Sequence, residues 1–440
     1  MYGRRLHVVF FLLGILMVTS LYKLVEHNSY INGHLDTLWL RPKQQFAQHV
    51  RLQNQTPVLN NAIIYRSRAQ WNVAPNSDQK GVTDITTVPS HLSSKGTCQP
   101  HLNVAFMKIH KCGSSLISHM FFRFGYEHNL IVALPPKKDR EIIGGFGTIK
   151  DVDYEHPPVG KRWNVFAHHA MYNRTRFHQL MAPNSRYVAI LREPLQRLMS
   201  AFQYFNLEKR FPGLKEETPF GIAYVTTYLA RPSYWDSRYK QVNNIFGREH
   251  FCSRNCMARD LGLSERDYDN RTAVEEFIQG IENDFTTVLI LAYLPASLIL
   301  LKRRMCWTFY DILYTTEKHA RKQKYKTEAP ITEAMKRKFY RNNYADLMLF
   351  TRFNESLHRQ IRQESTDFQE EVDQFVRVNN DVFRLCHSTE MKEQGKMVVK
   401  KSKWNDAFTV GKSFCKRYVQ RRKYWDIVLR AKYRHGEIEN

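Results

Sequence analysis

Carboxylates are scarce in this chain of 440 residues, in which 42 Asp and Glu stand against 66 Lys and Arg. The formal net charge of +24 favours anionic partners such as phosphate, sulfate, acidic glycans, nucleic acid or an anionic membrane surface. A hydrophobic share of 43% excludes a disordered polycation, because such chains carry too few apolar side chains to build a core. A packed catalytic or binding domain is therefore expected.

Patterns of metal ligands are also missing. The seven cysteines are Cys98, Cys112, Cys252, Cys256, Cys306, Cys386 and Cys415. The closely spaced pair Cys252 and Cys256 has no second cysteine or histidine pair at zinc spacing. We interpret it as a local disulfide or as unpaired thiols, and the odd count leaves at least one cysteine free. No bound metal is predicted.

Long apolar runs are rare, and the one at the N-terminus is informative. Arg4 and Arg5 precede an apolar run over residues 6–22, which as a helix is about 25 Å long and just spans a thin bilayer. No small-residue cleavage site follows, although a cleaved signal peptide is the alternative. The positive-inside rule places residues 1–5 in the cytoplasm and the remainder in the lumen, which disfavours nucleic acid as a partner.

The rest of the chain divides into two parts. Residues 23–99 are polar and without a sustained apolar period, as in a lumenal stem, and residues 100–440 are expected to form the lumenal domain. Four N-glycosylation sequons add modest support for a lumenal setting. They begin at Asn54, Asn173, Asn270 and Asn354.

The apolar pattern of the domain alternates between strands and helices. Apolar runs at 103–108, 163–167, 186–192 and 287–292 are typical of buried strands, and helical spacing occurs at 116–127, 195–205 and 296–307. This alternation predicts an α/β fold, with a parallel sheet covered by helices on both faces and ligands at the carboxyl ends of its strands. From about residue 318 the pattern is charged and helical.

The loop after the first strand is a candidate phosphate site. It contains Lys108, His110, Lys111, Cys112, Gly113, Ser114 and Ser115. A turn of small residues directs backbone N–H groups to one point, and the helix that follows adds the positive end of its dipole and a serine cap. Lys111 is placed to bridge to a phosphate, but the glycine spacing of the Walker motif is absent, which disfavours a kinase or GTPase. Alone, the loop fits an ordinary capped helix equally well.

A second phosphate contact is predicted after the third of these strands. Arg192 can bind a phosphate dianion through two hydrogen bonds, and Ser200 lies about two turns into the following helix. Ser200 can join that contact only if the loop folds Arg192 back along the helix. Alone, this segment is more typical of an amphipathic helix that starts at Pro194 and carries a solvated or salt-bridged arginine.

Taken together, the two segments resemble the sulfotransferase family, in which an Arg and a Ser eight positions apart hold a 3'-phosphate. The likeness extends to the galactose 3-O-sulfotransferases, among them the galactosylceramide type, over roughly residues 98–360. The segments that carry it are 106–115, 122–130, 163–169, 191–194, 200–202, 300–307, 311–314 and 353–354.

The resemblance implies a P-loop-like sulfotransferase fold and a single-pass type II enzyme of the Golgi membrane. It implies transfer of a sulfuryl group from 3'-phosphoadenosine 5'-phosphosulfate (PAPS) to a carbohydrate hydroxyl, most plainly the 3-hydroxyl of a terminal galactose on a glycolipid or glycoprotein. The donor's 5'-phosphate would lie on Ser114 and Ser115, with Lys108 as a further phosphate or loop contact. Arg192 and Ser200 would hold its 3'-phosphate.

The resemblance also places His110 and His169 in the active site. A hydroxyl nucleophile needs a general base that titrates near the mildly acidic pH of the lumen, which is the range of histidine. We favour His110 as the base, His169 as the residue that positions the acceptor, and Lys111 as the group that stabilises the departing phosphate. We interpret His168 as structural.

Two departures from the family pattern are relevant. Cys112 and Gly113 stand where the family has Thr and a small residue, so oxidation of a thiol near the donor becomes a question. Residues 292–298 lack both carboxylates of the corresponding family segment, so acceptor choice is expected to differ. A glycosaminoglycan sulfotransferase and an inactive lumenal glycan-binding protein are the alternative hypotheses, and the sequence leaves homodimer formation open.

Overall fold

The computed structural model describes residues 98–136, 141–144, 147–239, 243–244, 247–248, 252–315, 330–388 and 395–435. The predicted tail and anchor, and the predicted stem up to residue 97, lie outside the described residues. Within those ranges no helix is both long and apolar enough to cross a bilayer.

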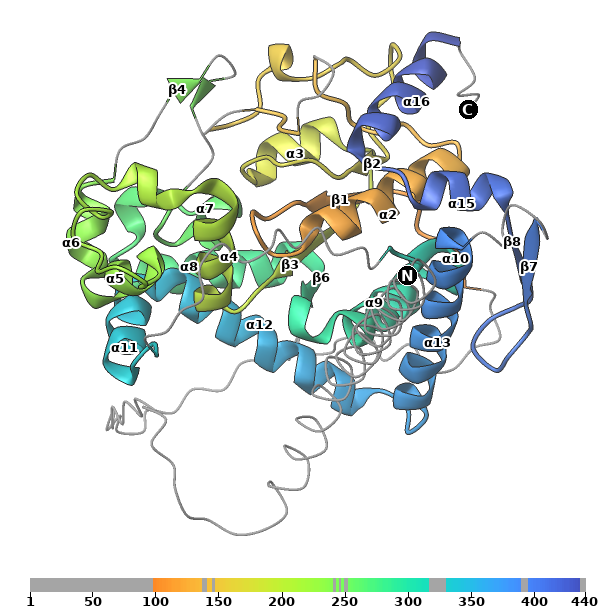
Figure 1. The fold of residues 1–440 in the computed structure, drawn as a ribbon. Helices are drawn as coiled ribbons and strands as arrows, with labels where there is room; N and C mark the ends of the chain where they lie inside the picture. Colours follow the sequence, from red (N-terminus) through yellow and green to blue (C-terminus); the bar gives the residue numbers. More distant parts are fainter. Residues whose placement is uncertain are drawn as a thin grey trace, which may run out of the picture. The chain divides into compact units, whose positions relative to one another are not determined.

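A four-stranded parallel sheet forms the centre of the described fold (Figure 1). Its strands are β1 (Val104–Met107), β2 (Val165–Phe166), β3 (Arg186–Leu191) and β6 (Phe285–Ile290). They lie in the order β2-β1-β3-β6, with every neighbouring pair parallel. Each strand falls on or overlaps an apolar run that predicted it, because burial on both faces selects such runs. The carboxyl ends of β1, β3 and β6 therefore meet at one edge.

Helices cover both faces of this sheet, as predicted. On one face the ring of Phe106 stacks on Phe121, with 4.9 Å between centroids. On the other face Phe166 and Tyr187 contact Phe177, at 5.0 and 6.4 Å. Phe166 and Tyr187 are both register partners of Ala105, the neighbour of Phe106 in β1, so they share the face opposite Phe106. The first of these helices is α2 (Ser114–Glu127) and the second is α3 (Arg174–Leu180).

Two further helices follow strands directly, as the sequence predicted. These are α4 (Pro194–Phe205) after β3 and α9 (Leu294–Met305) after β6, the latter through the short helix η4 (Leu291–Tyr293). The carboxylate of Glu193 accepts hydrogen bonds from the first N–H groups of α4, and a proline occupies its first turn. This is the helix start that the Glu-Pro pair indicated.

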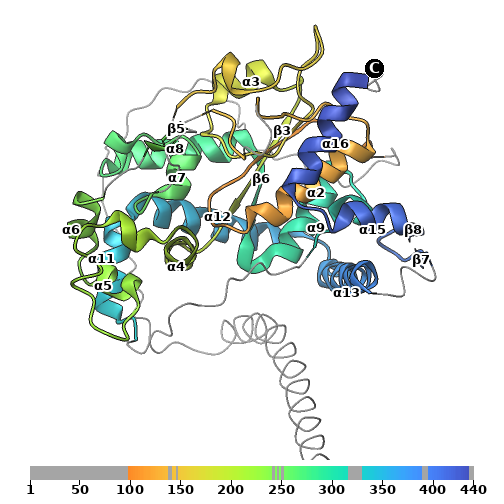
Figure 2. The ribbon, with the colours of Figure 1, turned by 45° about the horizontal axis from the view of Figure 1, so that its top comes forward.

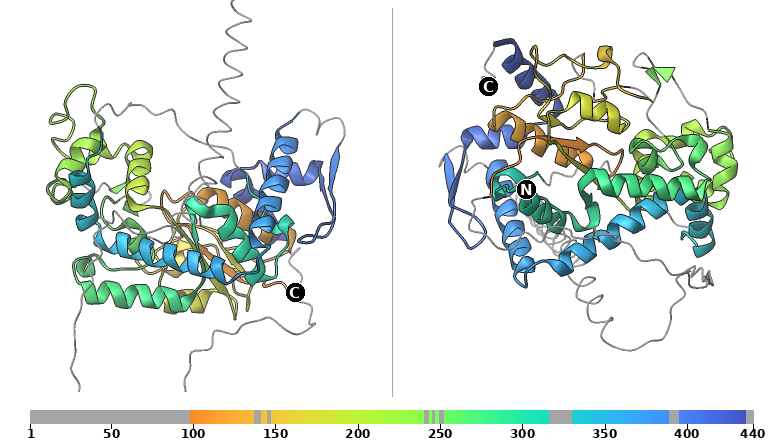
Figure 3. Two further views of the ribbon diagram at one scale, coloured as in Figure 1. Left: turned by 90° about the horizontal axis from the view of Figure 1, so that it is seen from below. Right: turned by 180° about the vertical axis from the view of Figure 1, so that it is seen from behind.

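The remaining elements surround the sheet. They are η1 (Asp151–Asp153), η2 (Leu207–Arg210), α5 (Tyr224–Ala230), α6 (Pro232–Ser237), β4 (Asn243–Asn244), β5 (Gly247–Arg248), α7 (Cys256–Asp260), η3 (Glu265–Asp267), α8 (Arg271–Asp284), α10 (Phe309–Ile312), α11 (Glu333–Asn342), α12 (Tyr344–Gln363), α13 (Phe368–His387), β7 (Lys396–Val399), β8 (Phe408–Gly411), α15 (Lys412–Tyr418) and α16 (Arg422–His435). Helices α8 and α12 contact each other and β6 (Figure 3). Helix α16 crosses α2 (Figure 2).

The core has two parts. The larger one surrounds the sheet, and a smaller one joins α4, α5, α6 and α11 through Phe202, Tyr228, Trp235 and Phe339. Helices dominate the C-terminal region as predicted, but the antiparallel pair β7–β8 was not predicted. Three disulfides join Cys98 to Cys306, Cys252 to Cys256 and Cys386 to Cys415, so the Cys252–Cys256 pair is a local disulfide.

Candidate active site

The two predicted phosphate segments meet at the carboxyl edge of the sheet. Strands β1 and β3 are neighbours, so the loop after β1 lies beside the start of α4. Arg192, which follows β3, donates a hydrogen bond from Nη1 to the carbonyl oxygen of Lys111 at 3.4 Å. Residues 81 positions apart thus form one site.

The loop after β1 owes its shape to two residues in left-handed backbone conformation. Lys111 has φ 65° and Gly113 has φ 74°. A Cβ atom on Gly113 would lie 2.6 Å from Cδ1 of Leu291, so glycine meets both the dihedral angle and the close approach of η4. Gly113 is also the N-cap of α2, which has no side-chain cap. The predicted serine cap is therefore wrong, and the first N–H groups of α2 are left for an anion.

The serines and the cysteine of this loop differ in exposure. Ser114 is buried and donates its hydroxyl proton to the carbonyl of Ile109 at 2.7 Å, whereas Ser115 is exposed. Cys112 is fully buried and is the free cysteine that the odd count required. Burial raises the pKa of the Cys112 thiol to about 12. A thiol is the poorly reactive form of cysteine, so the answer to the question that the sequence raised is that oxidation of Cys112 is disfavoured.

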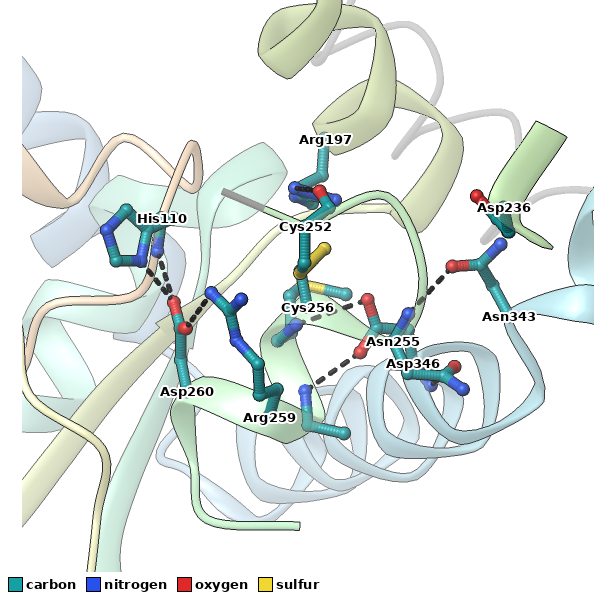
Figure 4. Close-up of a disulfide and its surroundings, with 12 residues drawn as sticks. His110, Arg197, Asp236, Cys252, Asn255, Cys256, Arg259, Asp260, Asn343 and Asp346 are labelled. Atoms are coloured by element: carbon teal, nitrogen blue, oxygen red, sulfur yellow. Dashed lines mark hydrogen bonds and ion pairs between the residues drawn. A yellow bond between two sulfur atoms is a disulfide. The ribbon is translucent and has the colours of Figure 1, made fainter. Parts of the chain in front are cut away.

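His110 is held by a carboxylate from a distant segment. Its backbone N–H and its Nδ1 atom both contact Oδ2 of Asp260, at 2.9 and 2.6 Å (Figure 4). Asp260 is the last residue of α7 and is 4% exposed. Its other oxygen accepts a hydrogen bond from Arg259 at 3.0 Å. No motif or spacing in the sequence indicated this pair.

His169 stacks on His110. The two imidazole centroids are 3.8 Å apart and the rings are inclined by 12°. Nδ1 of His169 lies 2.5 Å from the carbonyl oxygen of Lys108, and because a carbonyl only accepts, Nδ1 carries the proton. The neighbouring His168 is buried, and burial followed by the charges of Lys108 and Arg422 lowers its pKa to about 3. A permanently neutral imidazole suits the structural role expected of His168.

Lys108 is the first residue after β1 and is buried. It is 4% exposed, and its ammonium group lies 3.2 Å from Oε2 of Glu141. Glu141 also pairs with Arg422 of α16, at 3.2 Å. Burial lowers the pKa of Lys108, and attraction to Glu141 opposes that shift. Of the two roles predicted for Lys108, this geometry favours the loop contact over the phosphate contact.

Lys111 faces α4. Its ammonium group lies 3.5 Å from the centroid of Tyr204, a cation–π contact. Ser200 and Tyr204 are four residues apart in α4 and so share one face of that helix. Lys111, Arg192 and the Ser200 face of α4 therefore converge, although a joint contact of Arg192 and Ser200 to one phosphate stays a prediction.

Four aromatic residues could offer a ring face to a sugar, namely Trp163, Tyr172, Tyr204 and Phe205, and they differ in exposure. Trp163 and Tyr172 are buried and belong to the core. Tyr204 is 50% exposed and Phe205 is half-buried, and their rings meet edge to face at 4.9 Å. Only these two of the four candidates present ring surface at the site.

A polar cavity of about 1020 Å³ lies beside the His110–Asp260 pair and shares Arg259 with it. Figure 4 draws His110 and Asp236, a residue of the cavity wall, on opposite sides of the Cys252–Cys256 disulfide. Other lining residues are Arg231, Tyr234, Arg254, Glu265, Tyr268, Asp269, Lys338, Arg341 and Asn342. Among described residues no group of three metal-ligating side chains is found.

The structure brings the predicted residues His110, Lys111, Gly113, His169 and Arg192 to one place. Sequence reasoning missed Asp260 and Arg259 behind His110, Glu141 beside Lys108 and Tyr204 beside Lys111. Tyr204 had a signal, since it lies one helical turn after Ser200 on the face that was expected to meet the phosphate. The two acidic residues had none, because each lies outside the segments that resemble the family.

Comparison with known proteins gives a consistent result. Residues 12–407 match the model of the galactose-3-O-sulfotransferase family. Galactosylceramide sulfotransferase of Bos taurus is 29% identical over 303 residues, which cover 67% of this chain and 66% of the relative. Galactose-3-O-sulfotransferase 3 of Mus musculus is 31% identical over 270 residues, or 59% of this chain and 57% of the relative. The chain thus spans less than two thirds of the length of each relative, 66% of the first and 57% of the second.

Proposed function

This chain belongs to the galactose-3-O-sulfotransferase family, and from that premise we propose that it transfers a sulfuryl group from PAPS to a carbohydrate hydroxyl. The observation that carries the proposal is the stacked pair His110 and His169, at 3.8 Å, beside a helix N-terminus that no side chain caps. A binding module needs no base next to its anion site. The names of the relatives direct the proposal to the 3-hydroxyl of a terminal galactose on a glycolipid or glycoprotein.

The donor would bind along the edge of the sheet. The first N–H groups of α2, with Ser114 and Ser115, would hold the 5'-phosphosulfate. The Ser114 hydroxyl could donate to it only after breaking its hydrogen bond to the carbonyl oxygen of Ile109. Cys112 and Gly113 would shape the loop through their backbones. Arg192 and Ser200 would hold the 3'-phosphate, because the Ser200 face of α4 is turned toward Lys111.

The transfer itself needs a base, an in-line approach and a stabilised leaving group. His110 would take the proton of the sugar hydroxyl as the oxygen attacks sulfur. The bond between sulfur and the bridging oxygen of the donor then breaks, and adenosine 3',5'-bisphosphate leaves with the electron pair. Lys111 would stabilise the charge on that oxygen. His169 would orient the acceptor.

We further propose that the enzyme is a single-pass type II protein of the Golgi membrane, anchored by residues 6–22. The support is the apolar run behind Arg4 and Arg5, together with the four sequons. Three disulfides are consistent with an oxidising compartment. No metal is required by the proposed chemistry.

One experiment tests the proposed function. The full chain is incubated with PAPS labelled in the sulfate and with galactosylceramide, N-acetyllactosamine, core 1 disaccharide, desulfated heparan and chondroitin. Label on a terminal galactoside that vanishes in Lys111→Ala supports the proposal. No transfer to any acceptor, with adenosine 3',5'-bisphosphate still bound, would instead identify an inactive glycan-binding protein.

A glycosaminoglycan acceptor is the second candidate, and one observation favours it. Lys338 and Arg341 of α11 line the polar cavity. The ammonium group of Lys338 donates a hydrogen bond to the carbonyl oxygen of Ala230, a neutral acceptor. Together with the net charge of +24, such a wall suits a polyanionic sugar. Label on heparan or chondroitin alone would decide for this candidate.

A further inference from the structure

The geometry points to Asp260 as the residue that positions His110 and fixes its tautomer, so that Nδ1 keeps its proton and Nε2 receives the proton of the acceptor hydroxyl. This inference rests on the proposed sulfuryl transfer. It assigns a role to a carboxylate that lies 150 positions from the phosphate loop and outside every segment that resembles the family.

The tautomer follows from the acceptor character of a carboxylate. Oδ2 of Asp260 lies 2.6 Å from Nδ1 of His110, and an ionised carboxylate can only accept hydrogen bonds. Nδ1 must therefore carry a proton. The same oxygen also accepts the backbone N–H of His110 at 2.9 Å, so ring and backbone are oriented by one atom. The nitrogen left to gain or lose a proton is Nε2.

Asp260 is kept ionised in spite of its burial. Burial favours the neutral acid, but attraction to His110 and Arg259 and the hydrogen bonds from His110 outweigh it and hold the pKa of Asp260 well below its usual range. The Arg259 guanidinium lies 3.0 Å from Oδ1, and both side chains are almost fully buried. A buried charge so paired stays fixed, because water does not compete for it.

The segment that carries Asp260 is anchored on several sides. Asp346 of α12 accepts the N–H groups of Met257 and Ala258 at 3.2 and 2.8 Å, which caps the start of α7. The carbonyl of Asp260 accepts the N–H of Tyr172 at 3.0 Å. The Cys252–Cys256 disulfide closes the turn before α7 (Figure 4). The carboxylate thus stands on an ordered support, as a positioning group requires.

Asp260 also distinguishes the two stacked histidines. The rings of His110 and His169 are 3.8 Å apart, so simultaneous positive charges on both are disfavoured. His110 faces a carboxylate, while Nδ1 of His169 faces the neutral carbonyl of Lys108. Charged and titratable groups near the pair include Asp260 and Arg259, which donates to Asp260. The neutral thiol of Cys112 lies near the carbonyl oxygen of His110. The carboxylate of Asp260 therefore acts directly on His110, whereas His169 is held by a backbone carbonyl.

The test replaces Asp260 and measures more than activity. Asp260→Asn keeps the size but presents an amide, which can donate to Nδ1 and so favours the unproductive tautomer. We expect kcat to fall about 100-fold to 10,000-fold, with KM and the affinity for adenosine 3',5'-bisphosphate within about threefold of wild type. The acidic limb of the kcat/KM profile should move to lower pH, because the negative charge beside the imidazole is gone.

The matched control is Asp284→Asn. Asp284 is a buried carboxylate that accepts the Tyr172 hydroxyl at 2.9 Å and pairs with Arg174, away from His110. This control should keep kcat within about threefold and leave the pH profile unchanged. An Asp260→Asn enzyme that loses less than tenfold in kcat with an unmoved profile, or that loses bisphosphate affinity in proportion to kcat, would overturn the inference.

A second measurement does not depend on any variant of Asp260. In wild-type protein labelled with ¹⁵N in histidine, His110 assigned through His110→Gln should show a protonated Nδ1 across the pH range of activity. An unprotonated Nδ1 would overturn the inference even where Asp260→Asn fails to fold. If wild type sulfates no acceptor, the proposed function fails, yet the ¹⁵N spectrum still decides the tautomer.

Discussion

The imidazoles of His110 and His169 lie parallel, with centroids 3.8 Å apart, and each is anchored through its Nδ1 atom. Two unit charges at about 4 Å repel by about 4 kcal/mol at the effective dielectric constant near a protein surface. A positive charge on one ring therefore opposes a positive charge on the other. Replacement of either ring changes the surroundings of the other.

A double-mutant cycle follows from this relationship. His110→Gln and His169→Gln should each lower kcat by at least 100-fold, and the double variant should lose little beyond the worse single variant. Initial rates at saturating PAPS and acceptor measure this, with bisphosphate affinity as the check on folding. Strictly multiplicative losses would contradict a shared site.

The contact between Lys111 and Tyr204 gives a second prediction. The ammonium group lies 3.5 Å from the ring centroid, and such a contact contributes about 0.5–1 kcal/mol at an exposed site. Tyr204→Leu should weaken bisphosphate binding by about twofold to fivefold, whereas Tyr204→Phe should bind like wild type, because the ring remains. Calorimetric titration distinguishes them, and equal losses in both variants would mean that the hydroxyl matters instead.

Cys112 should be unreactive in the folded protein. It is fully buried, and burial raises the pKa of its thiol to about 12, so thiolate is scarce. The other six cysteines form three disulfides. A thiol-specific dye should therefore react with less than about a tenth of an equivalent under native conditions, and with one equivalent in denaturant without reductant. Fast native labelling, or several equivalents after unfolding, would argue against this arrangement.

Gly113 should tolerate no side chain. Gly113→Ala forces alanine into a left-handed conformation, which costs about 1–2 kcal/mol, and places Cβ 2.6 Å from Leu291. We expect weaker bisphosphate binding and a free energy of unfolding lower by about 1–3 kcal/mol in urea titrations. Gly280→Ala in α8 meets no atom within 4 Å and should raise stability by about 0.5–1 kcal/mol. A stable Gly113→Ala enzyme with normal affinity would show that the loop can shift.

The buried carboxylate Asp346 makes stability depend on pH. Burial raises its pKa to about 6, against the opposing backbone hydrogen bonds and Arg197. The folded state therefore binds the proton more tightly than the unfolded chain, and this contribution is fully present below about pH 4 and lost as pH rises through 6. Relative to Asp346→Asn, the free energy of unfolding of the wild type should fall by on the order of 3 kcal/mol between pH 4 and 7. Parallel stability curves would exclude this titration.

The sequence alone determined the features that are written locally. Apolar runs mark buried strands, and helical spacing with the Glu193–Pro194 start marks α4, because burial and capping act on neighbouring residues. The same holds for the turn of small residues before α2, which carries Lys111 and Gly113. These segments also carry the likeness to the family, so the class of chemistry follows from local sequence.

Only the tertiary structure decided how those segments are completed. Asp260 reaches His110 across 150 positions from α7, which packs on α12. Glu141 reaches Lys108 from a segment whose backbone is bonded to the N–H of His169. The residues that flank Asp260 and Glu141 in the sequence form no motif that sets these two carboxylates apart from the others. The N-cap of α2 is Gly113 and not a serine, and this too depends on the fold. Leu291 approaches Gly113 closely, and it follows β6, which lies two places from β1 in the sheet. Periodicity specifies which face of an element is buried, but the partners of a polar group are set by the fold, because contacts distant in sequence leave no local pattern.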